Sequence, residues 1–187
     1  MIRMSKILYV GALAVGFISL FLFGFPALYL VNDYSIPRDL GINDQTTTQV
    51  ALLLGILSLV PFLVIQTVIN LTVIYKMWAS IADGPNTRMT SGKAIGFLFI
   101  PFYNLYWLFQ VWNGFPEDYN RYLDDFSLPV SKISNAPYLV FAIVVLLCSI
   151  PFLGVLFAAL VAPLVLMFVT FKTCDAVNNL ADAKERK

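Results

Sequence analysis

The sequence predicts an all-α, polytopic membrane protein with four transmembrane helices. Hydrophobic residues make up 59% of its 187 residues, charged residues only 12%, and the mean hydropathy is +0.80. Soluble domains carry about 25% charged residues. Four apolar runs each meet the length of about 20 residues that a helix needs to cross a bilayer.

The four runs cover residues 7–31, 50–75, 93–115 and 138–171, and we treat residues 1–187 as a single membrane domain. The first run follows Arg3 and Lys6, as in a signal peptide. It is longer than the apolar region of about 7–15 residues in such peptides, so we expect an uncleaved first helix.

The last run leaves three structures open. As a straight helix it would measure about 51 Å, well beyond a hydrocarbon core of about 30 Å. Pro151 and Pro163 interrupt it. It therefore forms one long kinked helix, a helix with a re-entrant piece, or two helices.

The distribution of basic residues favours four crossings with both termini in the cytoplasm. Cytoplasmic loops carry the excess of Lys and Arg. With four crossings, nine basic residues lie inside and three lie outside. The inside residues are Arg3, Lys6, Lys76, Arg88, Lys93, Lys172, Lys184, Arg186 and Lys187. The outside residues are Arg38, Arg121 and Lys132. A fifth crossing would give the outside the larger share.

A short amphipathic helix is predicted over residues 116–126. Phe115, Tyr119, Tyr122 and Phe126 recur at helical spacing and form one apolar face among acidic neighbours. Such a helix is typical of the membrane interface.

Polar residues inside the runs have two interpretations. Gln66 and Asn70 lie four residues apart in the second run and share a helical face, and Asn104 lies in the third run. Amides in hydrocarbon need partners, so these side chains either form interhelical hydrogen bonds or line a polar path. We favour the hydrogen bonds, because no charged residue lies in the middle of a run to drive ion coupling.

Small residues and prolines predict close packing and kinks. Gly92 and Gly96 form a small-x-x-x-small pair, and Pro101 removes a backbone donor from the same run, near Asn104. The last run carries a similar set, made up of Pro151, Gly154 and Ala158.

Aromatic side chains concentrate in the third run and have two interpretations as well. They are Phe99, Phe102, Tyr103, Tyr106 and Trp107. They either contact a lipid or isoprenoid-type ligand, or they pack and anchor the helix at the interface, as Trp and Tyr commonly do. We favour packing and anchoring.

Several function classes are disfavoured by composition. The chain has no histidine, which excludes His-ligated haem, zinc and copper and a histidine base. Its two cysteines, Cys148 and Cys174, form no C-x-x-C pair, and the net charge of +1 gives no field for nucleic acid. We expect no catalytic, cofactor-binding or metal-binding residues, and no enzyme activity.

Residues 88–110 resemble a motif of uncharacterised bacterial multi-pass membrane proteins. The motif reads R-x-S-P-G-x-A-x-G-x-x-F-I-P-x-x-N-L. This chain carries Arg88, Ser91-Gly92, Ala94, Gly96, Phe99-Ile100-Pro101 and Asn104-Leu105, without the proline between serine and glycine. The resemblance implies a protein of the bacterial cytoplasmic membrane and implies no activity.

These observations favour a non-enzymatic membrane subunit that packs with itself or with other membrane proteins, and whose further partners are membrane lipids. The alternative is a small transporter or channel that uses proline-kinked helices and a path lined by Gln66, Asn70 and Asn104.

Overall fold

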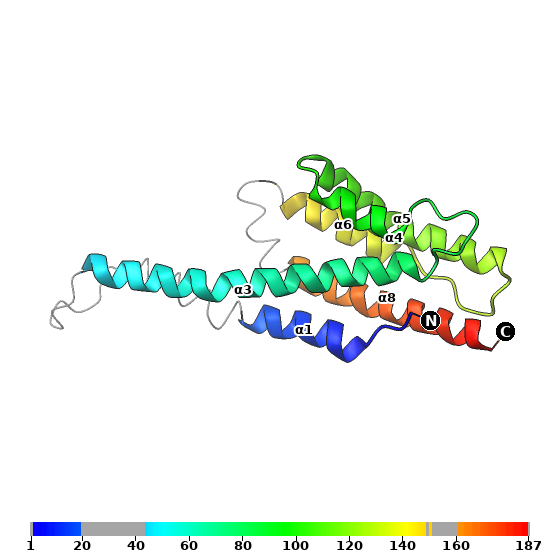
Figure 1. Cartoon of the computed structure of the whole chain (residues 1–187), viewed down its shortest axis with the longest axis horizontal. Coiled ribbons are helices and arrows are strands. Elements are labelled where there is room, and N and C mark those ends of the chain that lie inside the picture. Colours follow the sequence, from blue (N-terminus) through cyan, green and yellow to red (C-terminus); the bar gives the residue numbers. More distant parts are fainter. Residues whose placement is uncertain (1, 20–43, 149, 151–160, 187) are drawn as a thin grey trace. The chain divides into compact units, whose positions relative to one another are not determined.

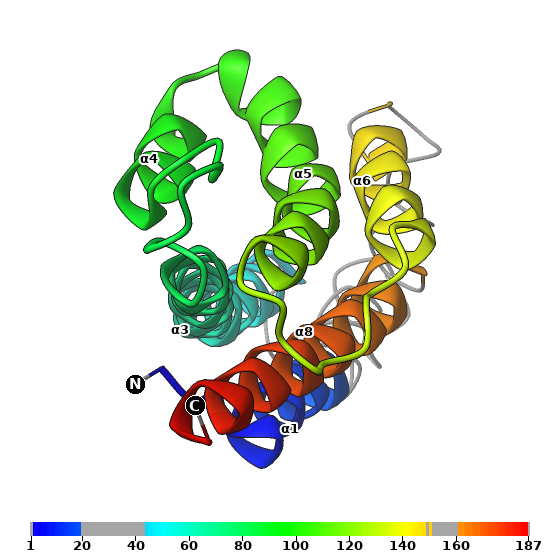
Figure 2. The ribbon, with the colours of Figure 1, turned by 90° about the vertical axis from the view of Figure 1, so that its right-hand side faces the viewer.

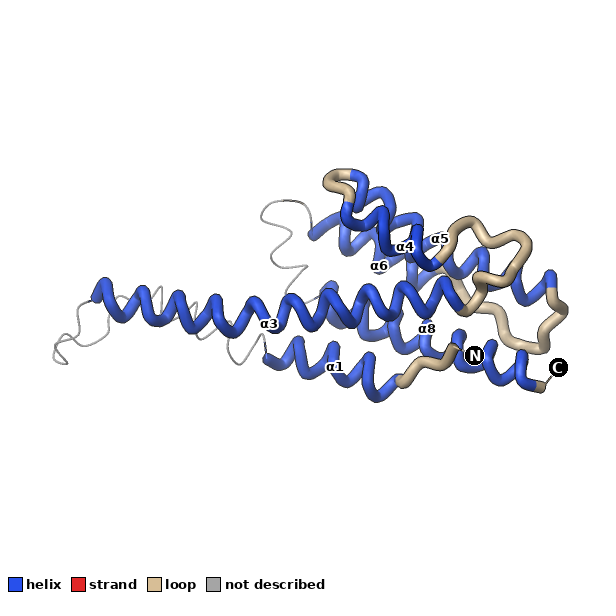
Figure 3. Tube along the Cα trace, in the orientation of Figure 1, coloured by secondary structure: helices blue, strands red, loops and turns tan. Residues whose placement is uncertain are grey.

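The computed structural model describes residues 2–19, 44–148, 150 and 161–186 (Figure 3). Within these ranges the chain forms six α-helices and one short 3-10 helix, and no strand. The predicted all-α class is therefore confirmed for the described residues. Their fold divides into two compact units, one formed by residues 1–11 and 70–187 and the other by residues 12–69.

Helices α1 and α3 each contribute to both units. Helix α1 (Lys6–Ser19) contains the beginning of the predicted run 7–31, whose remainder lies outside the described residues. Helix α3 (Asp44–Ala79) contains the whole predicted run 50–75. It extends that run at both ends, and its last turn carries Lys76 where the helix dipole favours a cation.

The third run is not one kinked helix, which corrects the prediction for residues 93–115. Helix α4 (Ser91–Gly96) is followed by the 3-10 helix η3 (Phe97–Phe99), and helix α5 (Tyr103–Asp125) begins after a break. Pro101 causes the break, because a residue before proline is driven out of the helical region. Ile100 is accordingly extended, with φ −86° and ψ 115°, and Phe102 has a φ of 63°.

The separate interfacial helix predicted for residues 116–126 is also wrong, since α5 continues through Pro116. The predicted apolar face is correct, but protein covers it instead of lipid. Phe115, Tyr119 and Tyr122 are all buried. The Tyr119 hydroxyl donates to the Ala176 carbonyl oxygen at 2.9 Å, which ties α5 to the last helix.

The described residues of the last run lie in two separate helices, apart from residues 150 and 161. Helix α6 (Ala136–Cys148) packs against both α5 and α8 (Ala162–Glu185), as Figures 1 and 2 show. The hydroxyl groups of Tyr138 at the start of α6 and Thr173 in the middle of α8 lie 3.0 Å apart. Pro163 occupies the first turn of α8, where its missing N–H costs nothing.

Aromatic side chains form much of the core between these helices. Trp78 and Trp112 are buried, the first with Phe115 at 5.9 Å between ring centroids and the second with Phe141 at 4.9 Å. Both contacts are edge-on, a geometry that aromatic pairs favour. Among the described residues, one helix, Ala162–Glu185, has the length and apolar composition to cross a membrane.

Candidate functional site

The first candidate feature is a hairpin of apolar residues, which is formed by α4, η3 and the first half of α5. We call residues 91–113 the apolar hairpin. Its first arm begins at Thr90, whose hydroxyl accepts a hydrogen bond from the Lys93 amide at 3.3 Å and so caps α4. Figure 2 shows α4 and the beginning of α5 as the two arms.

The two arms are held together by Trp107. Its indole Nε1 donates to the Ala94 carbonyl oxygen at 3.1 Å, from α5 back to α4. The Trp107 ring meets Phe97 edge-on, with centroids 4.7 Å apart, and stacks on Tyr103 at 5.8 Å. The polar bond and the Phe97 contact thus join the two arms, while the Tyr103 contact lies within α5.

The tip of the hairpin exposes its apolar side chains. Phe102 is 93% exposed, Phe99 68% and Tyr106 56%. The structure therefore brings together all the aromatic residues that the sequence marks for lipid or isoprenoid contact, namely Phe99, Phe102, Tyr103, Tyr106 and Trp107. Trp107 joins the two arms, and the others form an exposed surface.

The glycines of the hairpin make no close helix contact within the described residues. A Cβ atom added at Gly92 or Gly96 would meet nothing within 4 Å. Both glycines are exposed, so any close approach that they allow is to another molecule. The corresponding set in the last run, Pro151, Gly154 and Ala158, lies outside the described residues.

The three predicted polar-path residues differ in their surroundings. Gln66 donates from Nε2 to the Ala12 carbonyl oxygen at 3.3 Å, an interhelical bond between α3 and α1. Asn70 is half-buried. Asn104 is half-buried too, and its backbone amide donates to the Ile100 carbonyl oxygen at 3.0 Å at the start of α5. The Gln66 bond is of the interhelical kind that we favoured.

The second feature is a network of charged groups at the base of the apolar hairpin, which sequence reasoning missed. We call it the charged end. It consists of paired side chains within one compact unit, namely Arg3, Lys6, Asp83, Arg88, Glu117, Asp118, Arg121, Asp124, Lys132, Asp175, Asp182, Lys184 and Glu185.

Asp118 is the buried centre of this network, with a side chain that is 0% exposed. Its Oδ2 accepts a hydrogen bond from the Arg88 backbone amide at 2.8 Å. Its Oδ1 lies 2.9 Å from Arg88 Nε, an ion pair without hydrogen-bond geometry, and 3.7 Å from Arg121. Burial raises the pKa of Asp118 despite these cations, because desolvation disfavours the carboxylate.

This arrangement corrects the sides assigned to two basic residues. From the sequence we expected Arg88 inside and Arg121 outside, on opposite faces of a bilayer. In the structure both guanidinium groups lie on one carboxylate, at 2.9 and 3.7 Å. Charges separated by a hydrocarbon layer of about 30 Å cannot share a partner.

Asp83 joins the loop after α3 to two other helices. It accepts from Lys184 Nζ at 3.0 Å and from the Tyr122 hydroxyl at 3.1 Å. Burial opposes ionisation of Asp83, but the Lys184 ammonium and its hydrogen bond outweigh it, so the pKa lies below the ordinary value of 3.8. Lys184 also donates to the Ser80 carbonyl oxygen at 3.0 Å.

The N-terminal segment lies on α8. Met4 and Asn178 exchange two hydrogen bonds of 2.8 Å, one in each direction between the Met4 backbone and the Asn178 amide. Arg3 pairs with Glu185 at 2.8 Å, and Lys6 pairs with Asp175. The beginning and the end of the chain are therefore held together at the charged end.

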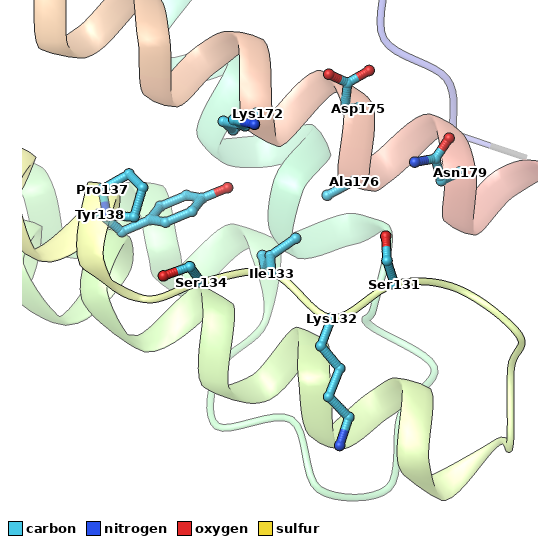
Figure 4. Close-up of a pocket in the computed structure, with 10 residues that line it drawn as sticks. All are labelled: Ser131, Lys132, Ile133, Ser134, Pro137, Tyr138, Lys172, Asp175, Ala176 and Asn179. Carbon is cyan, nitrogen blue, oxygen red and sulfur yellow. The ribbon is translucent and has the colours of Figure 1, made fainter.

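A groove of about 310 Å³ lies between α8 and the segment that precedes α6 (Figure 4). Its ionic and phenolic groups are already engaged. Lys132 points away from α8 to pair with Asp124 at 2.8 Å, and Asp175 pairs with Lys6. Within the described ranges, no group of three acidic, cysteine or histidine residues is placed to hold a metal ion.

The fold and these two features define a class, an all-helical protein with a paired charged end and exposed apolar helices. Comparisons with family models, curated proteins and solved structures find no match for this chain.

Proposed function

We propose that the chain is a non-enzymatic integral membrane protein, a subunit that packs with further copies of itself or with other membrane proteins. The observation that carries this proposal is the contrast between the two features above. Ionic groups pair with one another at the charged end, while large apolar side chains stay exposed along the helices.

The exposed apolar side chains occur on nearly every helix. Ile7 is 89% exposed in α1, Val68 57% in α3, Ile143 45% in α6 and Leu164 58% in α8. Monomeric soluble proteins expose such residues singly and rarely in contiguous patches above a few hundred Å². A bilayer covers surfaces of this kind, and the helices that lie in it satisfy their own backbone groups.

The location we propose is the bacterial cytoplasmic membrane, with several passes and with both termini at the cytoplasmic face. The pairing of Met4 with Asn178 supports a common face for the two termini, since it joins the first residues to the last helix. The charged end holds six of the chain's 12 Lys and Arg residues, and this concentration supports the cytoplasmic side. The resemblance at residues 88–110 points to the same membrane.

Packing with a partner is supported by the open glycine face of α4. Gly92 and Gly96 lie one turn apart, and neither has a neighbour within 4 Å of the place where a Cβ would stand. Small residues at this spacing let a second helix approach closely in a membrane. The interhelical hydrogen bond from Gln66 to Ala12 supports a packing role for the intramembrane amides and favours that role over the lining of a polar path.

The experiment is gentle extraction into nanodiscs followed by native mass measurement. We expect the protein in the alkali-resistant membrane fraction, and in masses above the 20.9 kDa of one chain. A protein released by alkali would contradict the membrane assignment. A membrane-bound species that stays at 20.9 kDa would contradict the assembly role alone.

A further inference from the structure

We infer that the apolar hairpin enters the bilayer from the face that holds the charged end, penetrates one leaflet, and leaves by the same face. Its partner is the acyl-chain layer of that leaflet. This inference rests on the proposed membrane location, and it adds a re-entrant topology in place of the crossing helix predicted for residues 93–115.

Both ends of the hairpin are fixed at the same place. Asn86, before the first arm, donates to the Asp125 carboxylate at 2.9 Å, after the second arm. Arg88 reaches Asp118 through its backbone amide at 2.8 Å and through its side chain. These four polar groups lie at the two ends of a segment in which no charged residue occurs between Lys93 and Glu117.

The arms are too short to cross a membrane. From Tyr103 to the first acidic residue, Glu117, α5 rises by about 21 Å at 1.5 Å per residue. The other arm, α4 with η3, measures about 15 Å. A hydrocarbon core is about 30 Å thick. The tip therefore lies about half of the core's depth from the charged base, which is the thickness of one leaflet.

The turn at the tip is suited to an apolar surrounding. Irregular backbone in hydrocarbon is costly unless its polar groups are paired. The amide of Ile100 donates to Phe97 at 3.3 Å, and that of Tyr103 to Pro101 at 2.7 Å. Pro101 has no amide hydrogen to satisfy. The side chains that face outward there, Phe99 and Phe102, are the most exposed of the hairpin's large apolar residues.

An acyl layer fits this surface better than water does. An exposed phenylalanine, such as Phe102 at 93% exposure, has a hydration cost in water that an acyl layer removes. Tyr106 stands about one turn below the tip, and Lys93 stands at the base of the first arm, in the order apolar, amphipathic and charged that interfacial segments follow.

The test uses cysteines on either side of the hairpin. In a background of Cys148→Ala and Cys174→Ala, the exposed positions are changed as Asn86→Cys and Asp125→Cys, each alone and together. Sealed vesicles of one orientation are treated with a membrane-impermeant maleimide, and detergent-opened vesicles give the total. We expect both single variants to be labelled from the same face.

The double variant gives a second readout that does not depend on vesicle orientation. A short bifunctional maleimide should cross-link positions 86 and 125, whose side chains touch in the structure. Labelling from opposite faces together with loss of the cross-link would overturn the inference, because residues 93–115 would then cross the bilayer. Failure of alkali resistance would instead remove the proposed function.

The identity of the partner is tested at the tip. A fluorophore on Phe102→Cys should lose its emission in vesicles whose lipids carry a nitroxide on the acyl chain, and a fluorophore on Asp125→Cys should keep it. Emission that survives at position 102, with same-face labelling at 86 and 125, would show that protein covers the tip and would overturn the lipid assignment.

Discussion

The indole Nε1 of Trp107 donates a hydrogen bond of 3.1 Å to the Ala94 carbonyl oxygen, across the two arms of the apolar hairpin. This bond joins residues that a continuous helix over 93–115 would place more than three turns apart. The bond is therefore possible only because the chain turns back at Pro101.

Trp107→Phe should loosen the hairpin. The substitution keeps an aromatic ring against Phe97 and removes the hydrogen bond, at a cost of about 1 kcal/mol. Tyr103→Phe is the matched control, since it alters the same ring cluster without touching this bond. Thermal unfolding in detergent, followed by tryptophan fluorescence together with a probe at position 102, should show a lower midpoint for Trp107→Phe alone. Equal midpoints would contradict this role.

Phe102→Gly should stabilise the protein in detergent. Its φ of 63° is strained for a residue with a Cβ, and glycine removes a cost of about 1 kcal/mol or more. Ser127→Gly is the comparison, because Ser127 has a φ of 48° at the charged end. Both variants should raise the unfolding midpoint. A gain at Ser127 alone would mean that the turn at residue 102 has another conformation in detergent.

Gly96→Leu should disturb assembly without unfolding the chain. The structure leaves open space at this position, so a leucine side chain meets no neighbour within the described residues. In a complex it would block the close approach of a partner helix. Native mass in nanodiscs should shift toward the single chain, while Tyr103→Phe should leave the mass unchanged. Identical masses for the two variants would locate assembly elsewhere.

Arg88→Met should destabilise the charged end more than Arg121→Met. Removing Arg88 leaves the Asp118 carboxylate buried without its nearest cation, at a cost of about 2–3 kcal/mol. Arg121 is 44% exposed and 3.7 Å from Asp118, so its loss costs less than about 1 kcal/mol. Adding Asp118→Asn to Arg88→Met should restore about half of the loss, because no buried charge remains.

The pH dependence of the Arg88→Met variant follows from the same carboxylate. The pKa of Asp118 is already raised by burial, and loss of Arg88 raises it further. A raised carboxyl pKa contributes stability at acid pH, and that contribution is lost as pH rises through the folded-state pKa. The unfolding midpoint of the variant, measured relative to wild type, should therefore improve as the solution is acidified from neutral.

Asp83→Asn should show the opposite dependence. The Lys184 ammonium holds the pKa of Asp83 below 3.8. A depressed carboxyl pKa contributes stability above the unfolded-state value, and that contribution is lost as pH falls through the folded-state pKa. Wild type should exceed Asp83→Asn by under about 1 kcal/mol at neutral pH, since the pair is partly exposed. The two should converge below pH 3.8. A constant difference would refute the pairing.

The sequence predicted the local features of this fold well. The all-α class, the helix over residues 50–75 and the apolar face of Phe115, Tyr119 and Tyr122 all follow from hydropathy and from spacing along the chain. The neighbours of that face did not follow. Spacing shows that a face is apolar, but either lipid or protein can cover an apolar face. The contact of Tyr119 with Ala176 is therefore visible only in the tertiary structure.

The charged end was out of reach of sequence reasoning for a related reason. Arg88 and Asp118 are 30 positions apart, and the intervening run reads as long enough to separate them by a membrane. Only the turn at Pro101 brings them together. A run of about 20 apolar residues fits one crossing helix or two half-length arms equally well by composition.

Pro101 in the third run and Pro116 just after it show which features follow from the sequence and which depend on the tertiary structure. Pro101 and Pro116 impose the same local restraint, a missing donor and a preceding residue pushed toward extended backbone. The helix breaks at Pro101, where the neighbouring side chains Ile100 and Phe102 are exposed. It continues through Pro116, where Phe115 is buried among the helices. The local steric restraint of each proline can be predicted from the sequence. The packing that overrides this restraint at Pro116, and not at Pro101, exists only in the folded protein.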